Sequence, residues 1–250
     1  MNSRKKSEKR IHNEFFSKDT RKKLSLFYSI TEKSTSFYDD LLVNNCFNKK
    51  VLDYGCGKGD EVFFLAKYSS EIFGIDISEE GIKQALKKLE EEPESIKRKI
   101  NFLVMDGEKM TFKDNSFDIV CGTGILHHLN LDSSLKEIRR VLKPTGKAIF
   151  FEPLGHNPVL NIFRRFTPNL RTPDEHPLLM RDIKKAYNYF NKVNIHFFHF
   201  FSLLAVPFKN TKIFNPLLNN LEKIDKNFFK FFPFVKLMAW IIVIEFSQPK

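Results

Sequence analysis

The sequence has few cysteines, no long apolar run and no recognisable metal-binding motif. Its three cysteines, Cys46, Cys56 and Cys121, are not spaced as metal ligands are, and their odd number near apolar runs indicates free, buried thiols in a reducing compartment. Residues 1–10 are strongly charged and are not followed by the apolar core of a signal peptide. No segment reaches the roughly 18 uninterrupted apolar residues that a membrane-spanning helix needs. We therefore expect a cytoplasmic protein without a bound metal ion.

Basic residues and phenylalanine are abundant instead. The 250 residues include 28 phenylalanines, and the formal net charge is +11. A chain of this length can bury a large core, and α/β folds of this size are commonly single domains. Apolar runs alternate with amphipathic segments between residues 50 and 150, which predicts a parallel sheet with helices on both faces.

Residues 51–59 carry the most informative pattern in the chain. An apolar strand leads into glycines at positions 55, 57 and 59, and a helix is expected over residues 61–68. Glycine permits a tight turn and lets a ligand approach the backbone closely. A second apolar run ends in Asp76, and a carboxylate at the tip of the second strand suits two vicinal ribose hydroxyls.

The spacing of the glycines argues against a dinucleotide. Dinucleotide-binding loops prefer G-x-G-x-x-G, which leaves a helix N-terminus open to a diphosphate. Here the third glycine comes one residue early, and Asp53 lies two residues before the first. A carboxylate at that place would repel a diphosphate and attract a cationic amine or sulfonium. This pattern favours S-adenosylmethionine over NAD.

Taken in order, these motifs resemble those of the class I S-adenosylmethionine-dependent methyltransferases over residues 50–152. Asp53-Tyr-Gly-Cys-Gly-Lys-Gly59 resembles the first motif of that family, and Asp76 its ribose-binding acid. Further matches are the fourth strand at residues 117–122, the loop after it at 126–129 and the turn into the fifth strand at 141–147. The resemblance implies a Rossmann-like, seven-stranded, mostly parallel sheet with helices on both faces and an antiparallel last strand at the sheet's edge.

The resemblance also implies how one domain, residues 1–250, is organised. A helical cap is expected over residues 1–48, a cofactor-binding core over 49–152, and a substrate loop, a helical lid insertion and the last strands over 153–250. Strands six and seven are expected near residues 192–201 and 236–246. Aromatic residues of the cap, Tyr28 among them with Phe37 and Tyr38, are candidates to close the cofactor cleft, although core packing explains them equally well.

Ten positions are implied as cofactor-binding. Asp106 lies where the family holds the adenine amino group, and Asp76 is the ribose acid. Simpler interpretations remain for single motifs: a tight turn for the glycines, a helix N-cap for Asp76 and a solvated loop acid for Asp106. The full set is Asp53, Gly55, Cys56, Gly57, Gly59, Asp76, Ile77, Asp106, Gly107 and Gly122.

The acceptor site is expected beyond the carboxyl ends of the strands, where ligands of open α/β sheets bind. The candidate catalytic residues are His176 as a base, His128 and Glu152, with Glu152 orienting an acceptor. Arg164 and Arg171 could bind an acceptor carboxylate or phosphate. The alternative is that the loop from residue 152 to 177 carries only surface ion pairs and that His127 and His128 only pack. The predicted acceptor-binding residues are Tyr28, His127, His156, Arg164 and Arg171.

Residues 208–234 mix phenylalanine and leucine with five lysines. This composition fits an apolar acceptor lid or a surface that lies on an anionic membrane. Completion of the core is an equally good explanation of the aromatic residues, since a basic amphipathic pattern is only suggestive.

The sequence therefore predicts methyl transfer from S-adenosylmethionine to a small, hydrophobic or amphipathic acceptor at oxygen, nitrogen or carbon, as in the quinone-type branch of the family. A nucleic-acid methyltransferase is the first alternative, prompted by the net charge of +11. The fourth strand leads into Gly122-Thr-Gly-Ile-Leu126 and not into the Asn/Asp-Pro-Pro-aromatic run of base-modifying enzymes, so nucleic acid is not the expected partner. A non-catalytic S-adenosylmethionine-binding protein is the second alternative, and the oligomeric state is left open.

Overall fold

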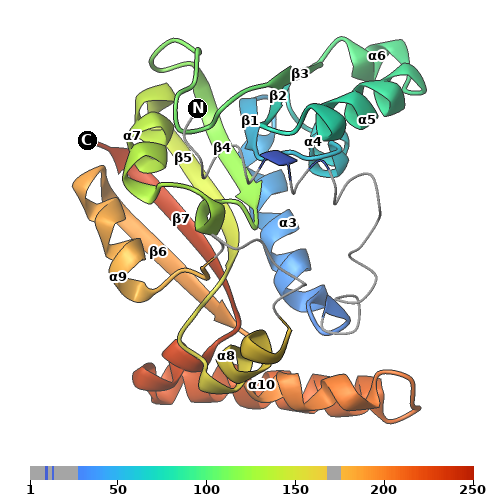
Figure 1. The fold of residues 1–250 in the computed structure, drawn as a ribbon, viewed down its shortest axis with the longest axis vertical. Helices are drawn as coiled ribbons and strands as arrows, with labels where there is room; N and C mark the ends of the chain where they lie inside the picture. The colour runs from blue at the N-terminus through green and yellow to red at the C-terminus, as the bar shows by residue number, and fades with distance from the viewer. Residues whose placement is uncertain (1–8, 11–12, 14–27, 168–175) are drawn as a thin grey trace.

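The computed structural model describes residues 9–10, 13, 28–167 and 176–250, which build one sheet flanked by helices (Figure 1). The strand order is β3-β2-β1-β4-β5-β7-β6. Neighbouring strands are parallel except where β7 pairs with β5 and β6. The predicted Rossmann-like, mostly parallel seven-stranded sheet is confirmed. The bounds are β1 Lys50–Tyr54, β2 Glu71–Asp76, β3 Ile100–Val104, β4 Phe117–Thr123, β5 Leu142–Pro153, β6 Phe190–Phe198 and β7 Ile241–Pro249.

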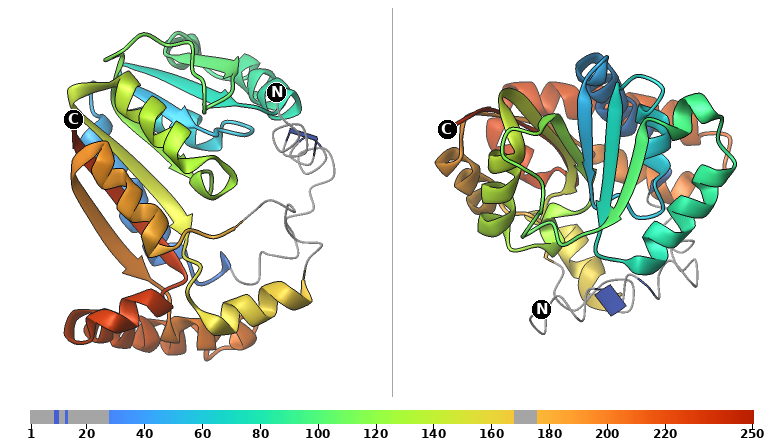
Figure 2. Two further views of the ribbon diagram at one scale, coloured as in Figure 1. Left: turned by 60° about the vertical axis from the view of Figure 1, so that its left-hand side comes forward. Right: turned by 90° about the horizontal axis from the view of Figure 1, so that it is seen from above.

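Helices cover both faces of the sheet (Figure 2). One face packs against α3 (Glu32–Cys46), α4 (Asp60–Leu65) and α5 (Glu79–Glu90), and the other against α7 (Leu131–Val141) and α9 (Met180–Lys184). Val51 belongs to the first of these two cores and Leu52 to the second, because successive side chains of a strand point to opposite faces. The remaining elements are α6 (Glu94–Lys97), α8 (Pro158–Phe166), α10 (Phe214–Phe231) and the 3-10 helices η2 (Leu126–His128), η4 (Lys185–Asn188), η5 (Phe201–Phe208) and η6 (Pro233–Met238).

The prediction that the last strand lies at the sheet's edge is wrong. Strand β7 is antiparallel, as expected, but it lies between β5 and β6, and β6 forms the edge. Ile241 to Ile244 are all buried, because helices or loops cover both faces of β7 at that place. An uninterrupted run of four β-branched residues is the pattern of a strand buried on both faces.

Several predicted boundaries shift by a few residues. Helix α4 spans residues 60–65, whereas 61–68 was expected. Strand β6 spans residues 190–198, whereas 192–201 was expected. The last strand starts at Ile241, later than expected, because the proline-led residues 233–238 form η6.

Polar contacts join helix α3, the end of β6 and the C-terminal insertion, residues 208–234. The Asp225 carboxylate accepts hydrogen bonds from the backbone N–H groups of residues 200, 201 and 202, at 3.1, 2.6 and 3.2 Å. Lys33 of α3 pairs with Glu222 of α10 at 2.5 Å, and Ser34 Oγ lies 2.7 Å from His199 Nε2. Helix α3 is therefore joined to α10 and to the end of β6. Within the part of the chain that the structure describes, no helix is long and apolar enough to cross a bilayer.

We predict that Asp225→Ala destabilises the protein by about 2–3 kcal/mol, because the substitution leaves three backbone N–H groups, one of them buried, without an acceptor. Urea unfolding followed by circular dichroism measures this loss. Asp225→Asn, which keeps one acceptor oxygen, should fall between the wild type and the alanine variant. A loss below about 0.5 kcal/mol for Asp225→Ala would show that the carboxylate is dispensable.

Candidate functional site

The glycine turn after β1 is folded against the end of β2. The backbone N–H groups of Gly55 and Cys56 both donate to the carbonyl oxygen of Ile75, at 2.8 and 2.9 Å. Gly55 and Gly59 have φ of +85° and +81°, a region that favours glycine. A Cβ on Gly55 would lie 2.6 Å from the side chain of Ile125, so the turn and the loop after β4 approach as closely as glycine permits.

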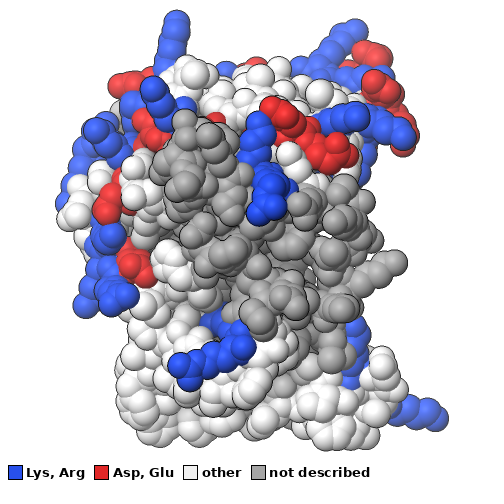
Figure 3. Space-filling model, in the orientation of Figure 1, with Lys and Arg blue, Asp and Glu red and all other residues white. Residues whose placement is uncertain are grey.

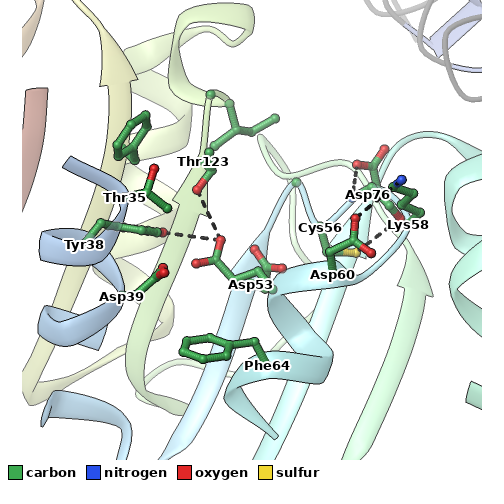
Figure 4. A pocket seen from close by; sticks show the side chains of 16 residues that line it. Thr35, Tyr38, Asp39, Asp53, Cys56, Lys58, Asp60, Phe64, Asp76 and Thr123 are labelled. Atoms are coloured by element: carbon green, nitrogen blue, oxygen red, sulfur yellow. Dashed lines mark hydrogen bonds and ion pairs between the residues drawn. The ribbon is translucent and has the colours of Figure 1, made fainter. Parts of the chain in front are cut away.

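A cavity of about 420 Å³ opens beside this turn, at the carboxyl ends of β1, β2 and β4 (Figure 4). Helix α3 contributes residues to its wall. The predicted residues Asp53, Gly55, Cys56, Gly57 and Asp76 all line it. The other lining residues are Thr35, Tyr38, Asp39, Lys58, Asp60, Glu61, Phe64, Thr123, Gly124, Ile125 and Phe151.

The cavity is acidic. Five of its lining residues are carboxylic acids and one is a lysine. That lysine, Lys58, lies 3.6 Å from Asp60, which also pairs with Lys88 at 2.5 Å. The acids deeper in the cavity therefore produce a field that favours a cation and disfavours a diphosphate.

Asp53 is the most deeply placed of these acids. Its side chain is 2 % exposed, and its Oδ2 atom has no hydrogen-bond partner among the residues that the structure describes. Burial raises the pKa of Asp53 well above its usual range, and the nearby carboxylates of Glu61 and Asp76 add to the rise. A buried carboxylate oxygen without a partner is costly, and a cationic ligand in the cavity would supply the missing one.

Glu61 lies beside Asp53 at the start of α4. It accepts hydrogen bonds from Thr123 Oγ1 at 3.2 Å and from the Tyr38 hydroxyl at 3.5 Å (Figure 4). Burial raises the pKa of Glu61 to about 7, and the carboxylate of Asp39 adds to the rise, whereas the two hydrogen bonds oppose it. Glu61 can therefore exchange a proton near neutral pH.

Tyr38 connects the cap helix to the strand ends. Its hydroxyl accepts from the Gly122 N–H at 3.2 Å and donates to Glu61. Burial raises the pKa of Tyr38 well above its usual range, so the phenol stays protonated. Tyr38, one of the aromatic residues predicted to close the cleft, lines the cavity, whereas Tyr28 is exposed and packs near Trp240, with ring centroids 5.6 Å apart.

Asp76 orders the loop around itself. Its Oδ2 accepts from the Gly57 N–H at 2.8 Å and its Oδ1 from the Ser78 N–H at 2.7 Å. The N-cap of α5 is Ser78, whose hydroxyl accepts from the Gly81 N–H at 3.0 Å, so the interpretation of Asp76 as an N-cap is wrong. Each Asp76 oxygen retains a lone pair that can accept from a hydroxyl.

The remaining predicted cofactor residues, Gly59, Ile77, Asp106, Gly107 and Gly122, are not among the residues that line the cavity. Asp106 Oδ1 accepts from the Glu108 N–H at 3.0 Å. A Cβ on Gly107 would lie 2.5 Å from the Tyr54 ring, and one on Gly122 would lie 2.6 Å from the Tyr54 carbonyl oxygen. Glycine is thus required at positions 107 and 122 for packing against Tyr54 of β1, independently of any ligand.

Glu152 and His127 form a buried pair behind the cavity. Glu152 is fully buried; its Oε1 accepts from the Ile125 and Leu126 N–H groups at 2.8 and 2.7 Å, and its Oε2 lies 2.6 Å from His127 Nδ1. The Glu152 carboxylate thereby fixes the backbone conformation of the loop after β4. The His128 ring stacks on His127, with centroids 4.1 Å apart.

The predicted acceptor residues of the loop after β5 are not brought together at the cavity. His156 Nε2 accepts from the Met180 N–H at 2.9 Å, and Arg164 donates to Asn161 at 2.9 Å within α8. His176 is exposed, and neither it nor the other two lines the cavity. Arg171 lies outside the described residues. Among the described residues, no cluster of His, Cys, Asp and Glu could hold a metal ion.

The site includes residues that motif reading missed. Thr35 and Asp39 come from α3, Glu61 and Phe64 from α4, and Thr123 from the end of β4. Of these residues, only Glu61 could have been found from the sequence, because it is an acid two residues after Gly59, the last glycine of the turn. The others are found only once the helices are placed.

A comparison with known families matches residues 52–150 to a methyltransferase domain. The chain is 36 % identical over 119 residues to a demethylmenaquinone methyltransferase of Lactococcus lactis, which covers 46 % of this chain and 45 % of that protein. It is 33 % identical over 111 residues to a sterol 4-C-methyltransferase of Caenorhabditis elegans, covering 44 % and 33 %. The aligned part therefore spans less than half of the length of either relative.

Solved structures confirm the fold over most of the chain. An N-methyltransferase of Haemonchus contortus, solved with phosphomonomethylethanolamine and S-adenosylhomocysteine, superposes with a TM-score of 0.63 at 16 % identity, covering 94 % of this chain and 59 % of that one. A geranyl diphosphate C-methyltransferase of Streptomyces coelicolor gives 0.59 at 12 % identity, covering 86 % and 79 %.

We predict that Glu61 makes stability depend on pH. Because its pKa is raised to about 7 in the folded protein, the folded state holds a proton that the unfolded chain releases above its ordinary pKa near 4.5. Stability should therefore fall as pH rises from about 4.5 to 7, by roughly 1–3 kcal/mol between pH 5 and 8. Urea unfolding at both pH values measures this fall, and Glu61→Gln should lack that part of it. Parallel pH profiles for the two proteins would contradict the assignment.

Proposed function

We propose that this chain, whose residues 52–150 match a methyltransferase domain, is a class I S-adenosylmethionine-dependent methyltransferase that transfers a methyl group from S-adenosylmethionine to a small hydrophobic or amphipathic acceptor. The observation that carries this proposal is Asp53, a buried acid in the wall of an acidic cavity, whose Oδ2 atom has no hydrogen-bond partner among the described residues. S-adenosylmethionine carries both an ammonium group and a sulfonium, so its charges complement this cavity.

The residues present fit this cofactor. We assign the ammonium group to Asp53 and Glu61, and the ribose hydroxyls to Asp76, whose oxygens still have lone pairs to offer. The turn from Gly55 to Gly59 lets the ligand approach backbone atoms that a Cβ would shield. Asp106 is our candidate for the adenine amino group, with Ile77 and Gly107 beside it.

The protein's residues would contribute mainly by positioning the acceptor and by shielding the reacting atoms from water. When bound, the sulfonium supplies an electrophilic methyl group, and an in-line displacement needs the acceptor's lone pair aligned with it and water excluded. Tyr38 and Thr35 of α3 and Phe151 of β5 form the wall that would do this. An acceptor that carries a proton must lose it, and His128 and His176 are our candidates to take it. Glu152 would contribute indirectly, by fixing the position of the loop after β4 and the orientation of the His127 ring.

The acceptor class is inferred from the relatives. Their names give a quinone precursor and a sterol as acceptors, both hydrophobic. Two features of this chain favour a similar acceptor: the aromatic side chains in the cavity wall and the phenylalanine-rich insertion after β6. A nucleic acid, by contrast, would be a poor ligand for a cavity with five carboxylic acids.

We propose a cytoplasmic location, with the enzyme reaching membrane-held acceptors from the aqueous side. Cys46, Cys56 and Cys121 are all free thiols, and Cys46 and Cys121 are buried. Burial raises the pKa of the Cys46 thiol to about 12, which keeps it unreactive. Free thiols are typical of a reducing compartment.

Calorimetric titration tests the cofactor. We expect micromolar binding of S-adenosylmethionine and S-adenosylhomocysteine and none of NAD, because a diphosphate would face the carboxylates of the cavity. Transfer of a labelled methyl group to amphipathic phenols and acids then tests catalysis. Binding without transfer to any acceptor would favour a non-catalytic S-adenosylmethionine-binding protein, and salt-sensitive RNA binding with RNA methylation would favour the nucleic-acid alternative.

We further predict that Asp76→Ala weakens S-adenosylmethionine binding by about 1–3 kcal/mol through loss of charged hydrogen bonds. Asp60→Ala is the matched control, because it removes the same charge from the cavity's rim, where Lys58 and Lys88 already pair with it. Asp76→Asn, which keeps one acceptor oxygen for the loop, separates ligand binding from loop order. Equal affinities for wild type and Asp76→Ala in calorimetry would refute the assignment of the ribose to Asp76.

A further inference from the structure

Exposed apolar side chains gather on the elements that lie across one end of the sheet. In Figure 1 and in the left view of Figure 2, α8 and α10 lie at the bottom, beyond the arrow tips of β4 and β6. Helix α8 exposes Val159, Ile162 and Phe166 at 69, 56 and 82 %. Their spacing of three and four residues puts them in one row along the helix, opposite the buried Leu160.

Helix α10 carries a second row of the same kind. Ile224, Phe228 and Phe231 are exposed and spaced by four and three residues. The row continues into η6, where Phe234 is 71 % exposed. The N–H groups of the Asn157 side-chain amide donate to the Met238 carbonyl oxygen at 2.7 Å, which joins the start of α8 to the end of η6. The two rows thus belong to connected elements.

A row of lysines runs beside the apolar row of α10. Lys223, Lys226 and Lys230 are exposed and precede the apolar residues by one or two positions, so they lie on the adjoining stripe of the helix. Of the two acids of α10, Glu222 pairs with Lys33, and Asp225 is buried and accepts from the backbone of residues 200–202. The lower part of the surface in Figure 3 is accordingly white and blue, without visible red.

We propose that this basic–apolar face, formed by the exposed residues of α8, α10 and η6, docks on an anionic lipid surface. Helix α10 has 18 residues and is about 27 Å long, and it would lie in the plane of the interface. Its phenylalanines would enter the boundary between headgroups and acyl chains, and its lysines would contact the headgroup charges.

The charge pattern favours lipid over protein. Lysine is depleted in the cores of protein interfaces, whereas here three lysines lie beside the exposed apolar row of α10. A second copy joined symmetrically through this face would bring lysine rows together, and like charges repel. A lipid surface needs no shape complementarity and rewards this combination of apolar and basic side chains.

The face lies on the side of the sheet where the cavity opens. The cavity is at the carboxyl ends of β1, β2 and β4, and its wall helix α3 also contacts α10 through Lys33 and Glu222. Docking here would turn the carboxyl ends of the strands toward the lipid. This inference concerns where the protein works and does not require the methyl-transfer proposal to hold.

Vesicle flotation with the full chain tests the proposal. We expect the protein to float with vesicles of phosphatidylcholine containing about 30 % phosphatidylserine, and much less with phosphatidylcholine alone or at 0.5 M salt, because salt screens the lysines. Lys226→Gln with Lys230→Gln should weaken binding about fivefold per lysine. Phe231→Ser with Phe234→Ser should weaken it at least about tenfold, since both rings lose apolar burial.

Matched control variants lie on α5, at the far end of the molecule in Figure 1. Lys83→Gln with Lys87→Gln removes the same charge, and Leu86→Ser removes an exposed apolar side chain, yet neither should change flotation. Circular dichroism and S-adenosylmethionine titration of every variant report folding and cofactor binding separately. The proposal is overturned if wild type stays with the aqueous phase, if the α5 variants lose binding equally, or if sedimentation shows a dimer that the Phe231 and Phe234 substitutions dissociate.

Discussion

The burial of carboxylic acids around one cavity is the constraint on which the site depends. Asp53 and Glu61 lie together at the strand ends, and burial raises the pKa of both. Without a ligand, the protein can limit this cost only by holding protons or by offering hydrogen-bond donors. Tyr38 and Thr123 donate to Glu61, and two backbone N–H groups donate to Asp76, but no described residue donates to Asp53 Oδ2. The glycine turn and helix α3 bring these acids together, and a bound cation would offset the cost of burying their carboxylates.

Local motifs were enough to predict which residues around the glycine turn line the cavity. The glycines, Asp53 and Asp76 are all set by the strand–turn–helix unit and its neighbour, so their geometry follows from a few consecutive residues. The acceptor end depends on long-range packing, and the sequence was a poorer guide to it. His156 resembled a ligand in its loop, yet its ring accepts from the Met180 N–H, a partner 24 residues away. Glu61 meets Tyr38 and Thr123 from two other elements, which no spacing rule could have shown.

Helix α3 links regions that are far apart in the sequence. On one side its Tyr38 contacts Gly122 and Glu61 at the cavity, and one turn earlier its Ser34 lies against His199 beyond β6. Burial lowers the pKa of His199 to about 3, so this ring is neutral and the contact does not depend on physiological pH. Helix α3 thus contacts α10 as well as the residues of the cavity, although about 170 residues of chain separate α3 from α10.

The place of β7 has a consequence for the order of assembly. Strand β5 is made about 90 residues before β7, and β6 about 40 residues before it, yet neither touches the other in the finished sheet. Until residues 241–249 arrive, a gap one strand wide separates them, and each presents a row of unpaired N–H and C=O groups. The strand next to one edge of the sheet is thus added last. During synthesis, this gap is the place where the nascent chain is most open to pairing with a strand of another molecule.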